Sequence, residues 1–382
     1  EKEKQLREDF EKVLEGKNNK GITERALKYD LTIPFARFVA MNHNQLTFPF
    51  KRYQIQPVWR ADRPQRGRYR EFYQCDADVV GSNALLNEVE LANIYQEVFS
   101  QLGLKDCIIK INHRKILTAL AELCGGAEKM IDITIAIDKL DKIGLEKVKE
   151  ELLTRGLNAV QVTIIEKYLG ITGSNDEKIT QLKTLLGDNS TGKKGIEELE
   201  YLYSKFATND STLAVDFTLA RGLNYYTGII FEVAAPPSIK MGSIGGGGRY
   251  DDLTGLFGVQ DIPGVGISFG VDRIYDVIEE LNLFPTEIHI STQVLFFNLG
   301  EAESQKAFEL MQKLRKKGIS SELYHENVKF DKQFKYAEKK NIPYVVIIGE
   351  KELKEGSCNL KKLSTGKQET FDINELFDYA FN

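Results

Sequence analysis

Residues 52 to 81 read "RYQIQPVWRADRPQRGRYREFYQCDADVVG" and form the most informative stretch of the chain. Apolar and polar residues alternate before and after the break "ADRPQRG", which is typical of strands whose side chains point to opposite faces in turn. We therefore predict two antiparallel strands over residues 47 to 81, joined by a long loop. Pro57 cannot donate a backbone hydrogen bond to a neighbouring strand, so its strand is expected at a sheet edge.

The loop between the two predicted strands is basic, although the chain of 382 residues has a formal net charge of −5. That sum argues against a surface coated with charge for nonspecific nucleic-acid binding, but it can hide a local field. Residues 51 to 70 hold one acid, Asp62, and the following cations: Lys51, Arg52, Arg60, Arg63, Arg66, Arg68 and Arg70. This segment is the most basic in the chain.

The second predicted strand orders its side chains by chemistry. One face carries, from cations through an aromatic ring to acids, Arg68, Arg70, Phe72, Gln74, Asp76 and Asp78. That order suits a ligand with phosphates at one end, a planar ring near Phe72 and an ammonium or N–H donor at the other end. An exposed, charged hairpin face explains the alternation equally well.

The stretch "PGVGISFGVDR", residues 263 to 273, predicts a strand that lacks large side chains on one face. That face carries Gly264, Gly266, Ser268 and Gly270. Such a strand lets a flat ligand approach the backbone closely. Tight packing of the strand on a helix would explain the glycines but not Arg273, which follows near the start of the next helix, so we favour a nucleotide-binding floor.

Two further motifs are weak signals when taken alone. "GSIGGGGRYDDL" contains the run Gly245 to Gly248, and glycine runs are more often flexible turns than sites. This motif matches neither the dinucleotide-binding fingerprint nor the Walker phosphate loop. "LKYDLTIPFARF" sets Asp30 and Thr32 ahead of a helical pattern that Pro34 opens, which favours helix capping over ligand binding.

The stretch "LARGLNYYTGIIFE", residues 219 to 232, carries no charge apart from Arg221 and Glu232. An arginine buried without a partner is costly, so an anion is expected to meet Arg221 if it is buried. Continuous alternation would place Arg221 and Tyr226 on opposite faces of a strand. We therefore predict a turn or bulge around residues 222 to 224 that brings both into one pocket.

The chain is too long for one ordinary core, and its pattern changes along its length. Helical spacing over residues 83 to 102 and 113 to 123 is followed by charged helical segments from about 125 to 210, which we interpret as a helical insertion. Strand character returns between residues 212 and 270. After Pro285, strands alternate with helical patterns, which indicates a small separate α/β domain.

Several protein classes are disfavoured by what the sequence lacks. Its 4 cysteines are far apart and its 4 histidines are scattered, so no spacing indicates a structural zinc site or thiol catalysis. Unclustered cysteines fit reduced thiols in a cytosol better than a disulfide framework. The charged N-terminus has no apolar core of a signal peptide, and no apolar run is long enough to span a bilayer. We expect a soluble protein.

Together these motifs resemble those of the histidyl-tRNA synthetases, a family of class II aminoacyl-tRNA synthetases. The hairpin looks like the second class II motif and "GVGISFGVDRI" like the third, while "RGLNYYTG" and "GGGGRYDDL" resemble histidine-specific stretches and "LKYDLT" an amino-acid-recognition stretch. The resemblance implies an α+β class II synthetase catalytic domain, an antiparallel sheet flanked by helices, over residues 1–124 and 211–287. It also implies a helical insertion at 125–210 and a C-terminal α/β anticodon-binding domain at 292–382.

The resemblance further implies the reaction and the site. L-Histidine would react with ATP and Mg²⁺ to give histidyl-adenylate and pyrophosphate, and would then be transferred to the 3′ end of tRNA(His); no zinc is expected. The histidine-binding residues would be Asp30, Thr32, Gln74, Asp78, Tyr225 and Tyr226, with Asp78 and Tyr226 reading the imidazole. The catalytic residues would be Arg60 and Arg221, both at the α-phosphate. ATP would be bound by Arg60, Arg68, Phe72, Gly266, Gly270 and Arg273.

The resemblance also implies a bacterial, cytoplasmic homodimer, with one departure. The first class II motif should place a proline at the dimer interface before "LKYDLT", but no proline precedes Pro34. We expect that disordered residues are absent from this sequence; if the motif is truly lost, dimerisation is in doubt. A regulatory paralogue that binds ATP phosphoribosyltransferase would typically lack the anticodon domain. "RGLNYYTG" with Asp78 argues against prolyl, threonyl or glycyl specificity.

Overall fold

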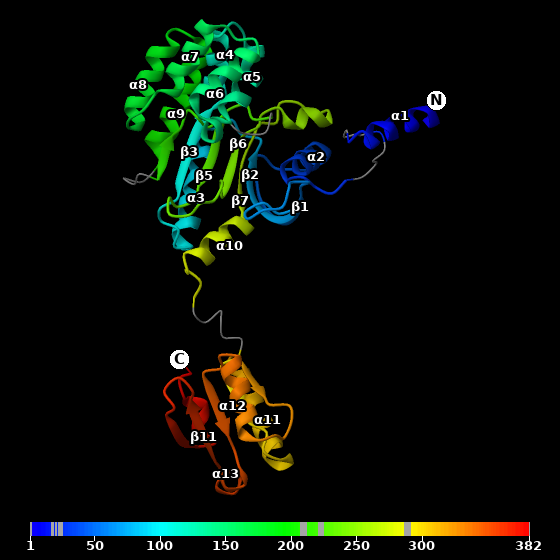
Figure 1. Ribbon diagram of the computed structural model, residues 1–382, viewed down its shortest axis with the longest axis vertical. Coiled ribbons are helices and arrows are strands. Elements are labelled where there is room, and N and C mark those ends of the chain that lie inside the picture. The colour runs from blue at the N-terminus through cyan, green and yellow to red at the C-terminus, as the bar shows by residue number, and fades with distance from the viewer. Residues whose placement is uncertain are drawn as a thin grey trace. The chain divides into compact units, whose positions relative to one another are not determined.

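The computed structural model describes residues 2–16, 19, 21, 26–206, 212–220, 225–285 and 292–381. The chain divides into two compact units, Glu1–Leu283 and Phe284–Asn382 (Figure 1). Within the described ranges, no helix is both long enough and apolar enough to cross a bilayer.

A seven-stranded sheet forms the centre of the first unit. Its strands lie in the order β1 (Phe50–Trp59), β2 (Glu71–Val80), β7 (Gly264–Gly270), β6 (Gly245–Arg249), β5 (Ile229–Ala234), β3 (Ile108–His113) and β4 (Leu213–Val215). Neighbouring strands are antiparallel except for β3 and β4, which are parallel. The predicted hairpin is therefore confirmed as β1 and β2, and β1 ends the strand order, as Pro57 indicated.

The glycine run forms strand β6, within the stretch predicted to have strand character, although glycine runs are more often flexible turns. β6 lies in the middle of the sheet, between β5 and β7. A Cβ added at Gly247 would overlap the carbonyl oxygen of Gly266, and one at Gly248 would lie 2.7 Å from the carbonyl oxygen of Ile229. The three strands therefore approach each other more closely than side chains on β6 would allow.

Two helices from distant parts of the sequence cover the sheet. α2 (Thr32–Asn42) buries Phe35 and Val39 against Val80 and Tyr250. α3 (Leu86–Gln101) lies under β6 and β7, where the Tyr95 hydroxyl lies 2.9 Å from the carbonyl oxygens of both Gly246 and Ser268 and shares its one proton between them. The Tyr95 ring packs on Phe269 at 4.9 Å. Because side chains alternate along β7, α3 lies on the face opposite to Ser268 and Gly270.

A helical block follows β3 and occupies the green part of the first unit in Figure 1. It contains α4 (Arg114–Leu123), η1 (Ala127–Lys129), α5 (Met130–Ile137), α6 (Leu140–Thr154), α7 (Ala159–Leu169), α8 (Asn175–Leu186) and α9 (Ser190–Lys205). Asn158 and Ser174 cap α7 and α8 with reciprocal hydrogen bonds, which explains why these helices begin there. The helices after α4 occupy the segment predicted as an insertion. The remaining helical elements of this unit are α1 (Lys2–Leu14), η2 (Leu253–Phe257) and α10 (Val271–Glu280).

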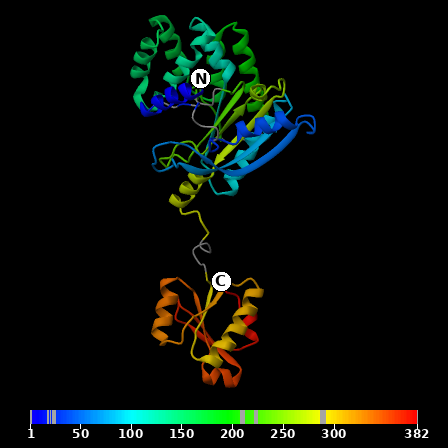
Figure 2. The same ribbon diagram turned by 90° about the vertical axis from the view of Figure 1, so that its right-hand side faces the viewer.

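The second unit alternates strands and helices, as the sequence predicted. Its elements are β8 (Val294–Phe296), α11 (Glu301–Lys316), β9 (Ser321–Leu323), α12 (Phe330–Lys339), β10 (Tyr344–Ile347), α13 (Glu350–Glu355), β11 (Ser357–Lys362), β12 (Gln368–Asp372) and η4 (Glu375–Asp378). The sheet order is β12-β11-β10-β8-β9, with β10, β8 and β9 parallel. α11 and α12 pack on opposite faces and build two separate apolar clusters (Figure 2).

Candidate functional site

A cavity of about 230 Å³ opens in the first unit above β2, β6 and β7. The loop between β1 and β2, the start of α2 and the start of α10 complete its wall. It is lined by these residues of the predicted site: Asp30, Thr32, Arg60, Arg68, Phe72, Gln74, Tyr225, Tyr226, Gly270 and Arg273. The residues expected to bind histidine and ATP therefore come together from four separate parts of the chain.

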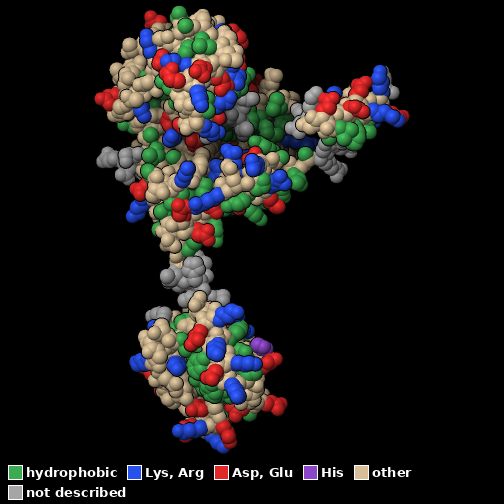
Figure 3. Space-filling model, viewed as in Figure 1, with side chains coloured by type: hydrophobic (Ala, Val, Ile, Leu, Met, Phe, Trp, Pro, Cys, Tyr) green, Lys and Arg blue, Asp and Glu red, His purple; other side chains and the backbone are tan. Residues whose placement is uncertain are grey.

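One end of the cavity is cationic. Burial, reinforced by the neighbouring cations Arg68 and Arg60, lowers the pKa of Arg273. Arg273 is fixed by donating to the carbonyl oxygens of Gly67 at 2.6 Å and Ser243 at 2.5 Å. On the face drawn in Figure 3, Lys and Arg side chains gather on the first unit between the helical block and α10. Guanidinium groups held this close together favour an anionic ligand.

An aromatic ring follows the cations along β2, as the alternation predicted. The Arg60 guanidinium lies 5.0 Å from the centre of the Phe72 ring and 4.5 Å from that of Tyr29. Its Nε also donates to the Tyr29 carbonyl oxygen at 3.2 Å. Arg60 is therefore held by cation–π contacts at the junction between the cationic end and the planar part of the cavity.

The other end of the cavity presents acceptors. Asp30 is 6% exposed, and burial raises the pKa of its carboxyl. Its Oδ1 accepts from the backbone N–H of Ile33 at 3.1 Å, so Asp30 both contacts the first turn of α2 and lines the cavity. Gln74 donates to the Ser268 hydroxyl at 2.8 Å, while its Oε1 is buried with no partner. A buried acceptor without a partner is costly unless a ligand supplies the donor.

Asp78 and Gly266, predicted to contact histidine and ATP, are not among the residues that line the cavity. Asp78 is 3% exposed, its Oδ2 pairs with Arg52 at 2.9 Å, and its Oδ1 accepts from the Tyr250 hydroxyl at 2.6 Å. A Cβ at Gly266 would overlap the Asp78 carboxylate. The missing side chain at Gly266 thus makes room for Asp78 rather than for a nucleotide. Direct contact of either residue with a ligand stays a prediction.

Comparison with known proteins agrees with the cavity. The family model for histidyl-tRNA synthetase matches residues 4–274, and that for an anticodon binding domain matches residues 293–380. The chain belongs to the histidyl-tRNA synthetase family. Histidine--tRNA ligase from Christiangramia forsetii is 54% identical over 358 residues, covering 93% of this chain and 78% of the relative. The corresponding ligase from Bacteroides fragilis is 53% identical over 355 residues, covering 92% and 78%.

Solved structures give the same fold. The crystal structure of histidyl-tRNA synthetase from Nostoc sp. PCC 7120 has a TM-score of 0.80 at 34% identity, covering 92% of this chain and 82% of that one. A Bacillus halodurans protein titled ATP phosphoribosyltransferase regulatory subunit/histidyl-tRNA synthetase shares the fold, with a TM-score of 0.67 at 23% identity. The class II synthetase fold predicted from the sequence is therefore confirmed.

Sequence reasoning gave no role to Asp76, which follows Gln74 on the same face of β2. Asp76 is 2% exposed, and its Oδ1 has no partner. Burial and the neighbouring Asp78 raise its pKa to about 7. The alternation placed Asp76 on the correct face, but it could not show that Arg52 and Tyr250 would satisfy Asp78 and not Asp76. Arg52 and Tyr250 were missed for the same reason.

Arg221 and the break predicted at residues 222 to 224 lie outside the described residues. Tyr225 and Tyr226, which follow directly, line the cavity with their ring centres 5.0 Å apart. The predicted meeting of Arg221 with an anion therefore remains a prediction. Within the described part of the chain, no cluster of three or more His, Cys, Asp or Glu side chains could hold a metal ion.

Proposed function

We propose that this cavity is where the chain, a histidine--tRNA ligase, activates L-histidine with ATP to histidyl-adenylate and pyrophosphate. Histidine is then transferred to the 3′ end of tRNA(His). The observation that carries this proposal is the polarity of the cavity, with Arg68 and Arg273 at one end and Gln74 and Asp30 at the other. ATP and histidine present complementary groups in that order, namely phosphates, a planar base and an α-ammonium.

ATP binding is assigned to the cationic end. Arg68 contacts the outer phosphates and Arg60 the α-phosphate, while Phe72 and Arg273 hold the adenine above Gly270. Arg221 is assigned to the α-phosphate from the family resemblance alone. Mg²⁺ enters as a complex with ATP, because it prefers oxygen ligands and usually takes several of them from phosphates.

Histidine binding is assigned to the acceptor end. The Asp30 carboxylate, the Thr32 hydroxyl and the free Oε1 of Gln74 accept from the α-ammonium. Tyr225 and Tyr226 enclose the imidazole, and the carboxyl groups of Asp78 and Asp76 lie behind them in β2. The orphaned Oδ1 of Asp76 supports an acceptor for an imidazole N–H at this depth.

The chemistry needs positioning and charge rather than a protein nucleophile. The carboxylate of histidine attacks the α-phosphorus of ATP in line, and pyrophosphate leaves. Guanidinium groups fixed before the reaction stabilise the charge that develops on the phosphoryl oxygens. The tether of Arg60 to Tyr29 supports such preorganisation at the α-phosphate, and the tethers of Arg273 to Gly67 and Ser243 fix the guanidinium that holds the adenine.

ATP–pyrophosphate exchange measured with each of the twenty amino acids tests this function. Histidine alone should support exchange. Arg68→Ala should raise the KM for ATP by about 10- to 100-fold, since a hydrogen bond to a charged group contributes about 1.5–3 kcal/mol. Arg63→Ala, at an exposed cation of the same loop that does not line the cavity, is the matched control. Absence of histidine-dependent exchange would contradict the function, and equal effects of the two substitutions would contradict the role of Arg68.

A homodimer is the assembly that the family resemblance implies, and β1 offers a surface for it. β1 ends the strand order, and its Tyr53 and Ile55 are 78% and 56% exposed. Large apolar side chains on an outer strand favour burial against another chain. Phe38 and Met41 of α2 are also exposed, at 47% and 71%. Sedimentation equilibrium measures the mass that decides between monomer and dimer.

A further inference from the structure

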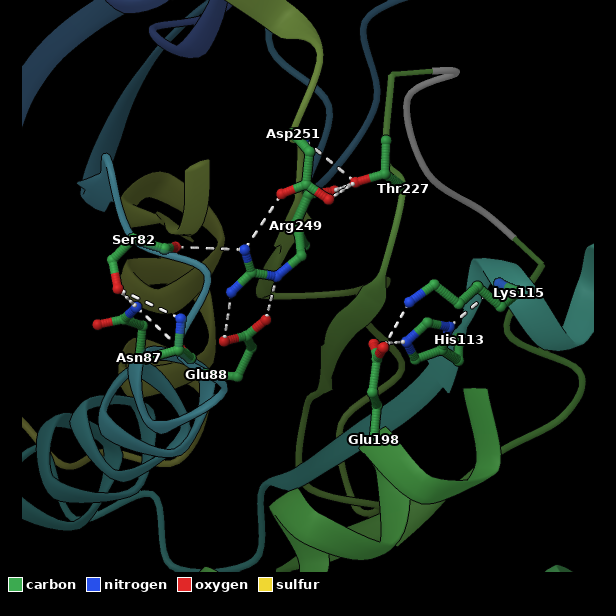
Figure 4. A network of polar contacts seen from close by, with 10 residues as sticks. Ser82, Asn87, Glu88, His113, Lys115, Glu198, Thr227, Arg249 and Asp251 are labelled. Atoms are coloured by element: carbon green, nitrogen blue, oxygen red, sulfur yellow. Dashed lines mark hydrogen bonds and ion pairs between the residues drawn. The ribbon is translucent and has the colours of Figure 1, made fainter. Parts of the chain in front are cut away.

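A buried ion pair lies beside the histidine end of the cavity. Arg249 at the end of β6 donates two hydrogen bonds to Glu88 of α3, from Nε to Oε1 at 2.5 Å and from Nη2 to Oε2 at 2.8 Å (Figure 4). The two side chains are 6% and 0% exposed. Burial raises the pKa of Glu88, and the hydrogen bonds and charge of Arg249 counteract this. A pair of this geometry fixes the guanidinium in one orientation.

Asp251 extends this pair to the loop that precedes β5. Its Oδ1 accepts from Nη1 of Arg249 at 3.1 Å, and its Oδ2 accepts from the Thr227 hydroxyl at 2.7 Å. The same hydroxyl accepts from the backbone N–H of Asp251 at 3.1 Å. The backbone N–H of Thr227 donates to the Arg249 carbonyl oxygen at 2.8 Å. Thr227 is therefore held through its backbone by Arg249 and through its side chain by Asp251, and Figure 4 shows the contacts with Asp251.

Tyr225 and Tyr226 immediately precede Thr227 and line the cavity. The Tyr226 ring packs against the backbone of β6, where a Cβ added at Gly248 would lie 2.9 Å from it. Tyr250 lies between Arg249 and Asp251 in the sequence. Its ring centre is 6.2 Å from that of Tyr225, and its hydroxyl donates to Asp78. Three consecutive residues thus support the tyrosine pair and Asp78 together.

We propose that Asp251 and Thr227 are positioning residues for histidine. Neither lines the cavity. Their hydrogen bonds fix the main chain next to Tyr226, so that both tyrosines enclose the imidazole in a single geometry. Arg249 and Glu88 anchor Asp251 to α3, which makes the support rigid. This inference rests on the proposed function of the cavity.

A purely structural role makes a different prediction. If the network only joined α3 to the sheet, loosening it would lower stability and weaken ATP and histidine binding alike. If it positions the tyrosines, loosening it at Thr227 weakens histidine binding alone, because the described residues assigned to ATP are carried by the β1–β2 hairpin, the end of β7 and the start of α10. The ratio of the two KM values separates these roles.

Pyrophosphate exchange on the full chain tests the proposal with two substitutions at one position. Thr227→Val keeps the shape but removes the hydroxyl, and should raise the KM for histidine about three- to tenfold, the value of about one hydrogen bond. The KM for ATP should stay within about twofold of the original. Thr227→Ser restores the hydroxyl and should restore the histidine KM. Thr254→Val is the control, because it removes a buried hydroxyl that has no hydrogen-bond partner.

Asp251→Asn and a double-mutant cycle complete the test. Asp251→Asn should raise the KM for histidine but not that for ATP, even if Thr227→Val folds poorly. In the double mutant, the effects of Asp251→Asn and Tyr226→Phe on the KM for histidine should not be additive. Unchanged histidine KM in a folded Thr227→Val, equal rises for both substrates, or full additivity would each overturn the inference. Failure of the unsubstituted chain to exchange with histidine would instead overturn the proposed function.

Discussion

Two carboxyl groups, Asp76 and Asp78, are buried on the same face of one strand, but their side-chain partners differ. Asp78 has Arg52 and the Tyr250 hydroxyl as partners, and its pKa is raised by burial to about 6. Asp76 keeps an Oδ1 without a partner, and its pKa is raised further, to about 7. A charged Asp76 therefore destabilises the folded chain, and a ligand that donates a hydrogen bond to its Oδ1 would reduce this destabilisation.

Asp76 makes its own contribution to the pH dependence of stability, beside that of Asp78. An unfolded chain leaves an aspartate with a pKa of about 3.9, so between that value and about 7 the folded state binds more protons, and stability falls as pH rises. Asp76→Asn removes this penalty. We expect it to raise the melting temperature at pH 8, with a gain that shrinks as the pH falls towards 4. The gain is at most about 1.4 kcal/mol for each pH unit that separates the folded from the unfolded pKa of Asp76.

Melting curves of both proteins without ligands, between pH 5 and pH 8, measure this difference. Asp106→Asn, at an exposed carboxyl, controls for the substitution itself. A melting-temperature difference that does not change with pH would contradict titration of Asp76 in this range. If Asp76 also accepts from histidine, Asp76→Asn should weaken histidine binding even where it stabilises the chain, a conflict typical of functional sites.

At the scale of elements, α10 holds the basic loop that carries Arg68. Three acids spaced four residues apart on α10 each bind this loop or the start of β2. Asp272 accepts from the Tyr73 backbone N–H at 2.7 Å, Asp276 accepts from the Tyr69 hydroxyl at 2.7 Å, and Glu280 pairs with Arg66. Arg68 lies between these points of attachment. The helix therefore restricts where its guanidinium can reach in the cavity.

Weakening this attachment should affect ATP selectively. Tyr69→Phe removes one hydrogen bond and should raise the KM for ATP about three- to tenfold, while the KM for histidine stays within about twofold. Glu279→Gln alters an exposed acid of the same helix and serves as the control. Pyrophosphate exchange with one substrate varied at a time gives both constants. A rise in the histidine KM as large as that for ATP would mean that α10 supports the sheet as a whole rather than the loop.

Side-chain periodicity predicted the strands along which apolar and polar side chains alternate. The hairpin β1–β2 and the face of Phe72, Gln74 and Asp78 follow from alternation, and Pro57 correctly placed β1 at the edge. β6 could not be predicted this way because four glycines carry no alternation, and only contacts with both neighbouring strands explain its composition. The docking of α10 and the pairing of Asp78 with Arg52 depend on how the strands are arranged in the sheet. A short stretch of sequence does not reveal that arrangement.

At the scale of the whole molecule, the second unit has its own core. Val294, Phe296, Leu310, Tyr344 and Leu360 bury their side chains in a cluster drawn entirely from this unit. Lys313, Arg315, Lys316 and Lys317 form an exposed basic run at the end of α11. The ammonium groups of Lys313 and Lys317 lie 5.5 and 5.9 Å from the centre of the Phe377 ring, so these two side chains are held against it. Exposed cations on a separately folded unit suit phosphate contacts of that unit.

Removal of residues 293–382 should therefore separate the two steps of the reaction. The first unit keeps the complete described cavity, so pyrophosphate exchange should stay within about twofold of the full chain. Aminoacylation of tRNA(His) should fall sharply, and the affinity for tRNA should become less dependent on salt, because each lost phosphate contact removes about 0.9 from the slope of log K against log salt on a duplex. Circular dichroism establishes that the shortened chain is folded, and sedimentation establishes that it has the same oligomeric state as the full chain. Full aminoacylation by this protein would show that the second unit does not read the anticodon arm. Loss of exchange in a folded protein would show instead that the second unit also shapes the cavity.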